Sequence, residues 1–147
     1  LYTNRSGGAS DGAVRVALDE LIQRSDIISL HIPITAETEG LISRQQFAQM
    51  KPGVVLINNA RGELVDEEAL YENLESGHVG CAGLDVLRRE PAAANNPLFA
   101  LDNVVITPHI AWLTVETIER SMAVAVENCS RLRDGLPLLH QIVGQIA

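Results

Sequence analysis

Arg61, Glu90 and His109 each follow shortly after a β-like run of apolar residues. A guanidinium binds a carboxylate through two parallel hydrogen bonds. An imidazole titrates near neutral pH, so it can donate and accept a proton. Brought together, side chains of these three types could hold a small carboxylic acid and move a proton at the group beside its carboxylate.

A contact between Glu90 and His109 would favour proton donation. A carboxylate beside an imidazole stabilises the protonated imidazolium, because opposite charges attract. The imidazolium could then protonate a carbonyl oxygen while a hydride reaches the carbonyl carbon. No side chain supplies a hydride, so this chemistry requires a cofactor.

Each of the three residues also has an ordinary structural interpretation. Arg61 could pair on the surface with Glu63 or Asp66. Glu90 could be a solvated loop acid, and His109 could be a core or surface residue without a catalytic role. Their coincidence at the ends of three apolar runs favours the functional interpretation, because complementary groups rarely gather there by chance.

Asp85 is a further acid at the end of an apolar run. It could accept a hydrogen bond from an amide or ring N–H, or it could form an Asx turn. The four histidines are scattered along the chain without the spacing of a ligand set, so no metal site is predicted. The sequence contains neither a GxSxG motif nor a P-loop.

Apolar runs alternate with helical patterns along the whole chain. Strands are predicted at 14–16, 27–30, 54–58, 79–86 and 104–106, and helices at 18–24, after Ser43 to before Lys51, after Asp66 to Gly77, and after Thr114 to near Gly135. Ser43 and Gln46 have the spacing of a capping box. This alternation predicts an α/β domain with a mainly parallel sheet, in which ligands bind beyond the carboxyl ends of the strands. The continuous apolar run at 54–58 further predicts that helices cover both faces of the sheet.

Composition and charge exclude several classes of protein. A chain of 147 residues can form one domain, and its net charge of −8 disfavours nucleic acids and anionic membrane surfaces as partners. No apolar run approaches the roughly 20 residues of a membrane helix, and no secretory signal is visible. Cys81 and Cys129 stand in apolar surroundings, which predicts two buried thiols in a reducing compartment rather than a disulfide. A cytoplasmic location follows from that prediction.

Four stretches of the sequence resemble the D-isomer-specific 2-hydroxyacid dehydrogenases. They are Ser25-Asp26 to His31-Ile32-Pro33, Lys51-Pro52-Gly53 to Val65-Asp66, Gly83-Leu84-Asp85-Val86 to Glu90-Pro91, and Thr107-Pro108-His109-Ile110-Ala111-Trp112. They follow the order and spacing of the family over nearly the whole chain. The resemblance implies a Rossmann-like, doubly wound parallel sheet. It also implies that Arg61 binds the substrate, that His109 is the acid/base, and that Glu90 is the partner of His109.

The resemblance implies a dinucleotide cofactor as well. NAD-binding members usually place an acid at the end of their second strand to hold the ribose hydroxyls. Here that region reads Tyr2-Thr3-Asn4-Arg5-Ser6, in which Arg5 and Ser6 could receive a 2′-phosphate, so NADP(H) is predicted over NAD(H). Alternatively, Arg5 is a solvated turn residue. The predicted cofactor contacts are Asn4, Arg5, Ser6, His31, Pro33, Ala60, Arg61, Asp85 and His109.

Trp112, directly after His109-Ile110-Ala111, resembles the branch of glycerate dehydrogenases and hydroxypyruvate or glyoxylate reductases. The implied substrate is therefore a small D-2-hydroxy acid or 2-keto acid. The Gly-rich GxGxxG loop of the family is absent, and we expect the first strand and helix of the nucleotide domain to be missing. Residues 1–135 are interpreted as an incomplete dinucleotide-binding domain, and residues 136–147 as a tail that would return to a missing substrate domain. Such a fragment is expected to be poorly active alone.

Two other interpretations share the same motifs. The C-terminal-binding-protein corepressors use this fold as a non-enzymatic dinucleotide sensor, and they keep all three residues of the site. The chain could also be an inactive oligomerising piece, since dimers of the family form through this domain. For the intact protein, the resemblance implies a homodimer.

Overall fold

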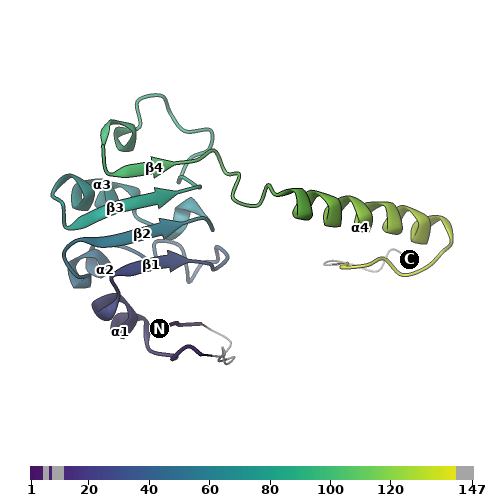
Figure 1. The fold of residues 1–147 in the computed structure, drawn as a ribbon, viewed down its shortest axis with the longest axis horizontal. Coiled ribbons are helices and arrows are strands. Elements are labelled where there is room, and N and C mark those ends of the chain that lie inside the picture. The colour runs from purple at the N-terminus through teal and green to yellow at the C-terminus, as the bar shows by residue number, and fades with distance from the viewer. Residues whose placement is uncertain (5–6, 8–11, 142–147) are drawn as a thin grey trace. The chain divides into compact units, whose positions relative to one another are not determined.

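The computed structural model describes residues 1–4, 7 and 12–141, and the chain divides into two compact units, Leu1–His109 and Ile110–Ala147 (Figure 1). In chain order the elements are helix α1 (Leu18–Arg24), strand β1 (Ile27–Leu30), helix α2 (Arg44–Gln49), strand β2 (Val54–Asn58), 3₁₀ helix η1 (Gly62–Leu64), helix α3 (Glu67–Glu75), strand β3 (Val79–Leu84), 3₁₀ helix η2 (Pro97–Ala100), strand β4 (Val104–Ile106) and helix α4 (Val115–Arg133). Among the described residues, no helix combines the length and the hydropathy needed to cross a membrane.

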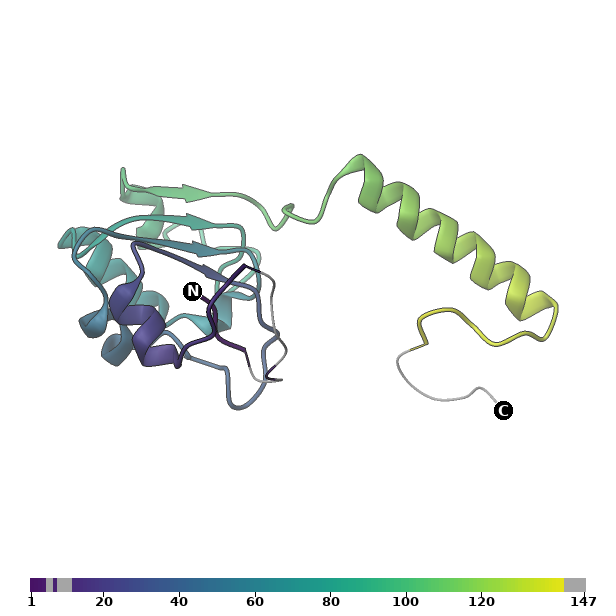
Figure 2. The same ribbon diagram turned by 60° about the horizontal axis from the view of Figure 1, so that its bottom comes forward.

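The four strands form one parallel sheet in the order β1-β2-β3-β4. Because parallel strands are joined by right-handed crossovers, a chain that adds each new strand on the same side keeps its connecting helices on one face. Figure 2 shows α1, α2 and α3 together beneath that face. The apolar core lies between these helices and the sheet, and its fully buried side chains include Ile22, Phe47, Leu56, Leu70 and Val79. The prediction of a Rossmann-like α/β fold is confirmed.

The opposite face of the sheet is open within the described part of the first unit. Ile27 is 63% exposed and Val105 is 68% exposed, and Ile57 of the central strand β2 is 36% exposed. The expectation that β2 is covered on both faces is therefore not met in this unit. The prediction of buried thiols was also wrong. Cys81 lies on β3, on the open face of the sheet. Cys129 lies on α4, a helix that buries none of its residues. Both are exposed free cysteines.

Capping side chains mark the predicted starts of α2 and α3, and a glycine marks the end of α3. Ser43 and Gln46 form the expected capping box at the start of α2. The Asp66 carboxylate accepts a hydrogen bond from the Ala69 N–H at 3.1 Å and begins α3. Gly77 ends that helix with a φ of +76°, which glycine adopts without strain. Local sequence therefore determines where these helices begin and end.

Two predicted segments differ in the structure. The expected strand at 14–16 is reduced to an isolated parallel bridge between Tyr2 and Arg15. Of the tail predicted at 136–147, residues 142–147 lie outside the described residues. The described part of the tail folds back along α4, where Asn128 exchanges side-chain hydrogen bonds with the backbone of Leu139 at 2.7 and 3.2 Å.

Candidate active site

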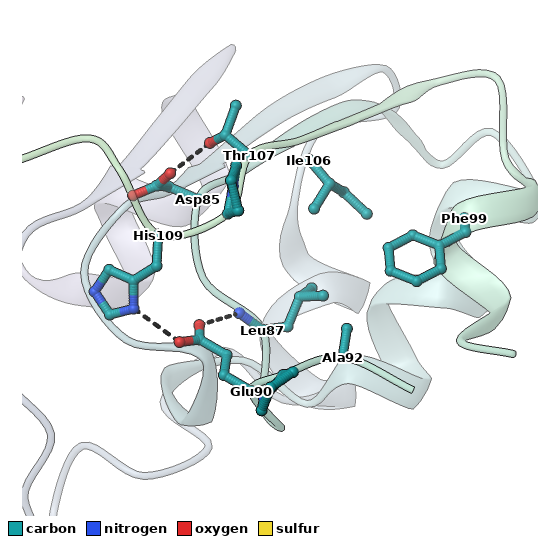
Figure 3. Close-up of a pocket in the computed structure, with 10 residues that line it drawn as sticks. Asp85, Leu87, Glu90, Ala92, Phe99, Ile106, Thr107 and His109 are labelled. Carbon is teal, nitrogen blue, oxygen red and sulfur yellow. Dashed lines mark hydrogen bonds and ion pairs between the residues drawn. The ribbon is translucent and has the colours of Figure 1, made fainter. Parts of the chain in front are cut away.

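The carboxyl ends of β2, β3 and β4 bring the predicted residues to one edge of the sheet. Asn58, Leu84 and Ile106 are neighbours in the strand register and end their strands side by side. Arg61 and His109 each follow three residues after their strands, and both line one cavity of about 360 Å³. His109 also lines a second cavity of about 620 Å³ (Figure 3). The structure thus gathers the side chains that the sequence singled out.

Glu90 orients the imidazole of His109. The Nδ1 atom of His109 lies 2.8 Å from Oε2 of Glu90, and Oε1 of Glu90 accepts a hydrogen bond from the Leu87 N–H at 3.0 Å (Figure 3). The hydrogen bond from His109, aided by that from Leu87, holds the pKa of the Glu90 carboxyl below its ordinary value of 4.5, although partial burial and the charge of Asp85 oppose the shift. An ionised carboxylate can only accept hydrogen bonds, so Nδ1 of His109 carries the shared proton. Nε2, which points away from Phe99 in Figure 3, is then the nitrogen that can exchange a proton with a substrate.

The backbone of His109 is held in an unusual conformation. Its φ is +57°, in the left-handed region that residues other than glycine seldom occupy. Its N–H donates to the Asp85 carbonyl at 2.9 Å and to the Thr107 carbonyl at 3.0 Å. Neighbouring strand ends therefore fix the direction in which the ring leaves the chain. Strain of this kind persists where the surrounding structure imposes it, often at functional sites.

Asp85 is a buried acid at the end of β3, with 7% of its surface exposed. The Thr107 hydroxyl donates a hydrogen bond to its Oδ1 atom (Figure 3), and the Asp85 N–H donates to the Asn58 carbonyl at 2.9 Å. Asp85 borders the 620 Å³ cavity, whose other walls are mostly apolar and include Leu87 and Ile106. A carboxylate beside an apolar cavity can anchor a flat, partly polar ring.

Asn58 holds the loop that presents Arg61. Its side chain is 1% exposed; Nδ2 donates to the Arg61 carbonyl at 2.8 Å, and Oδ1 accepts from the Ala60 N–H at 3.1 Å. The sequence interpretation treated Asn58 only as the last residue of a strand. The available signal was a polar residue closing a buried apolar run, because a buried amide must be hydrogen-bonded.

The Arg61 guanidinium donates to the carbonyl of Ala60 at 2.6 Å and forms no ion pair with a carboxylate in the described part of the chain. The alternative pairing with Glu63 or Asp66 is therefore not observed. The guanidinium instead lies exposed at the wall of the 360 Å³ cavity, where it can meet an anion.

Gly62 lets the Arg61 loop approach the loop that carries Glu90. A Cβ atom at Gly62 would lie 2.1 Å from the carbonyl carbon and oxygen of Leu87. No side chain fits in that space, so the close contact between the two loops depends on glycine. The residue types around Gly62 did not indicate this contact.

Four further predicted cofactor residues that the structure describes, Asn4, His31, Pro33 and Ala60, line neither cavity. His31 follows β1, is exposed, and contacts the Ser29 hydroxyl through Nε2 at 2.7 Å. Pro33 is exposed, and Ala60 is half-buried beside Arg61. The Asn4 side chain accepts a hydrogen bond from the Gly7 N–H at 3.2 Å, whereas Arg5 and Ser6 lie outside the described residues.

Comparison with known proteins finds reductases and dehydrogenases among the relatives of this chain. A hydroxypyruvate reductase from Blautia hydrogenotrophica is 46% identical over 84% of this chain and 38% of its own length. A D-3-phosphoglycerate dehydrogenase from Archaeoglobus fulgidus is 45% identical over 96% of this chain and 27% of its own. The chain thus spans well under half the length of these curated relatives.

Solved structures give the same result. An acyclic imino acid reductase in complex with NADPH and D-Arg superposes with a TM-score of 0.82 at 41% identity, over 92% of this chain and 43% of its own. A D-lactate dehydrogenase with NAD⁺ from Lactobacillus jensenii superposes with a TM-score of 0.81 at 35% identity, over 89% and 43%. Both structures carry a nicotinamide dinucleotide. The model of the D-isomer specific 2-hydroxyacid dehydrogenase NAD-binding domain matches residues 1–111, and the chain therefore belongs to that family.

Proposed function

We propose that this chain carries the acid/base and carboxylate-binding residues of an enzyme that interconverts a small D-2-hydroxy acid and the corresponding 2-keto acid. The observation that carries the proposal is the His109–Glu90 pair at 2.8 Å, on the wall of a cavity that Arg61 also lines. Relatives named hydroxypyruvate reductase and glyoxylate reductase, at 46% and 40% identity, support a small substrate.

Each residue has one task in the reduction direction. Arg61 binds the substrate carboxylate through its guanidinium fork and draws electron density from the adjacent carbonyl. The protonated His109 gives the proton on Nε2 to the carbonyl oxygen, while Glu90 stabilises the imidazolium and keeps the ring oriented. When bound, the cofactor supplies the hydride that reaches the carbonyl carbon. In the oxidation direction, Nε2 of His109 removes the hydroxyl proton.

The residues present fit a nicotinamide group. A nicotinamide has a flat ring with apolar faces and a carboxamide that donates hydrogen bonds. The 620 Å³ cavity offers apolar walls at Leu87 and Ile106 and the buried carboxylate of Asp85 at its edge. Asp85 would hold the carboxamide, and Ala60 with the segment from His31 to Pro33 would contact the rest of the dinucleotide.

The choice of NADP(H) over NAD(H) rests on residues 2–6, which contain no acid and include Arg5 and Ser6. The Arg15 guanidinium donates a hydrogen bond to the Asn4 carbonyl at 3.2 Å, which adds a positive charge beside residues 2–4. The matching structures contain NADPH in one case and NAD⁺ in another, so they support a nicotinamide dinucleotide without favouring either form. Exchange of Arg5 for alanine should raise the Kd of NADPH far more than that of NADH, and equal effects would contradict the assignment.

The remaining assignments concern the whole protein. Residues 1–135 would belong to the dinucleotide-binding domain, and residues 136–147 would lead back to a substrate domain. The small share of each relative that the chain spans, 38% and 27%, supports this organisation. A homodimer is part of the same proposal and rests on the family resemblance, whereas the proposed cytoplasmic location rests on the two free cysteines.

The test is cofactor oxidation by the complete enzyme with hydroxypyruvate and glyoxylate as substrates. We expect NADPH consumption that depends on the keto acid, and a His109→Ala variant whose kcat falls by about 10²–10⁴-fold. An exposed surface residue exchanged in parallel, such as Asp102→Asn, is the control. Near-normal turnover of the His109 variant would refute the acid/base assignment.

A further inference from the structure

The loop that carries Glu90 is bound at both ends by one carboxylate of helix α3. This loop runs from Asp85, directly after β3, to Asn96, directly before η2. Oε2 of Glu67 accepts a hydrogen bond from the Arg88 N–H at 3.0 Å. Oε1 of Glu67 accepts a hydrogen bond from Nδ2 of Asn96 at 2.8 Å. The two carboxylate oxygens therefore join two ends of the loop that lie far apart in the sequence.

The first of these contacts fixes the peptide bond beside Glu90. The Leu87 N–H donates a hydrogen bond to Glu90. The next N–H along the chain, that of Arg88, donates to Glu67. The carbonyl side of the same peptide faces Gly62 so closely that no Cβ fits between them. Glu67 thus binds the N–H group of a peptide that is already confined at its carbonyl.

The second contact links the loop to the apolar core. Nδ2 of Asn96 donates to Glu67, while Oδ1 of Asn96 accepts the Leu98 N–H at 2.9 Å and begins η2. Leu98 is 1% exposed and belongs to the core of the first unit. Through Asn96, the Glu67 carboxylate therefore connects the loop to a residue that is fixed by burial.

The environment of Glu67 suits a carboxylate that accepts hydrogen bonds. It is the half-buried first residue of α3, where the helix macrodipole favours a negative charge. Within the described ranges, its carboxylate takes part in no ion pair. The next acid, Glu68, differs in both respects: its side chain is 81% exposed, and it lies 3.7 Å from the Arg44 guanidinium. Two adjacent acids of one helical turn thus have different surroundings.

We propose that Glu67 is a positioning residue for the His109–Glu90 pair. By binding both ends of the loop, it keeps the Glu90 carboxylate within hydrogen-bond distance of the imidazole. Glu67 lines neither of the two cavities beside His109, so it acts through the backbone of the loop. The proposal rests on the proposed function, because it assumes that His109 transfers the proton.

Exchanging donor and acceptor between Glu67 and Asn96 tests the link. Glu67→Gln replaces one acceptor oxygen by an NH₂ group, which cannot accept a hydrogen bond from the loop. A shift of about 1 Å at reacting groups costs about 100-fold in rate, so kcat of the complete enzyme should fall by about 10- to 100-fold. Glu67→Gln/Asn96→Asp again places an amide opposite a carboxylate, and Asp caps a helix as well as Asn does, so most of kcat should return. Glu68→Gln, the matched control, should leave kcat unchanged.

A second measurement shows whether Glu67 acts through Glu90. If it does, Glu67→Gln lowers kcat of the wild-type enzyme but leaves kcat of the Glu90→Gln enzyme unchanged, because the contact with His109 is already lost there. The free energy of unfolding in urea should fall in both backgrounds. A purely structural role would instead change kcat by the same factor in both.

The outcomes separate this proposal from the proposed function. Equal kcat of the Glu67→Gln and Glu68→Gln enzymes would overturn the positioning role, and so would an equal factor in both Glu90 backgrounds. If Glu67→Gln alone does not fold, the double exchange is the test: recovered folding and turnover support the link with Asn96, and no recovery overturns it. A wild-type enzyme that reduces no 2-keto acid would refute the proposed function and the positioning role together, whereas the urea measurements would still decide whether Glu67 holds the loop.

Discussion

Replacing Gly62 with alanine is expected to separate the two loops that meet beside the His109–Glu90 pair. The added Cβ would lie 2.1 Å from the carbonyl carbon and oxygen of Leu87, whereas ordinary contacts begin at 3.4 Å. The carbonyl must therefore retreat by about 1.3 Å. Because the opposing atoms belong to the backbone, no flexible side chain can move aside, and we expect a loss of about 3 kcal/mol in the free energy of unfolding, the upper range for overpacking.

The same displacement has a kinetic consequence. Leu87 donates its N–H to Glu90, and Glu90 orients the His109 ring. A movement of about 1 Å at catalytic groups can cost about 100-fold in rate, so kcat/KM of the Gly62→Ala enzyme should fall by that order.

The assay combines urea unfolding of the chain with steady-state kinetics of the complete enzyme. Gly83→Ala is the matched control, because a Cβ there meets no atom within 4 Å and lies on the open face of the sheet. We expect the control to change the stability of the chain little. Equal stability losses in the two variants would refute the close-packing argument. A destabilised Gly62→Ala enzyme with unchanged kcat/KM would refute the link to the His109–Glu90 pair.

Three further predictions concern residues around the site. Asn58→Ala leaves the Ala60 N–H and the Arg61 carbonyl without their side-chain partner, so unfolding should become easier by about 1–3 kcal/mol and KM should rise, measured by urea unfolding and kinetics. Arg61→Lys should raise KM for the keto acid, because an ammonium cannot reproduce the fork; an unchanged KM would remove Arg61 from carboxylate binding. Since the pKa of Glu90 is lowered in the folded chain, its stabilisation is complete above about pH 4.5 and is lost as the pH falls through the lowered value. The stability difference between the wild type and Glu90→Gln should therefore shrink below pH 4.5, and a difference that grows on acidification would contradict the contact.

Local patterns predicted most helices and strands, because the residues that determine each of them lie close together in the sequence. The apolar run at 54–58 and the cap of Ser43 act within a few residues, and both appear in the structure as expected. The gathering of Arg61, Glu90 and His109 also followed from sequence, since the carboxyl ends of adjacent parallel strands meet at one edge.

The contacts between loops could not be predicted in the same way. Gly62 meets Leu87 across 25 positions, and nothing in the residue types near Gly62 indicates which backbone will face it. The exposure of Cys81 likewise depends on the direction in which successive strands were added, a property of the whole sheet. The residues next to Cys81 in the sequence are apolar, and this predicted a buried thiol. Whether a helix covers that face depends on the topology of the sheet, which these residues do not show.

The position of the His109–Glu90 pair between two different cavities is a consequence of the parallel sheet. His109, Glu90 and Leu87 line both the 620 Å³ cavity, which is mainly apolar, and the 360 Å³ cavity, which Arg61 also lines. A hydride donor with an apolar ring and an anionic acceptor require opposite environments, yet their reacting atoms must come into contact. A loop that follows the last strand of the sheet can place one imidazole where both environments meet. In the proposed reaction the proton would be delivered from the boundary between the cavities, and the charge of Arg61 would stay outside the apolar cavity where the ring would lie.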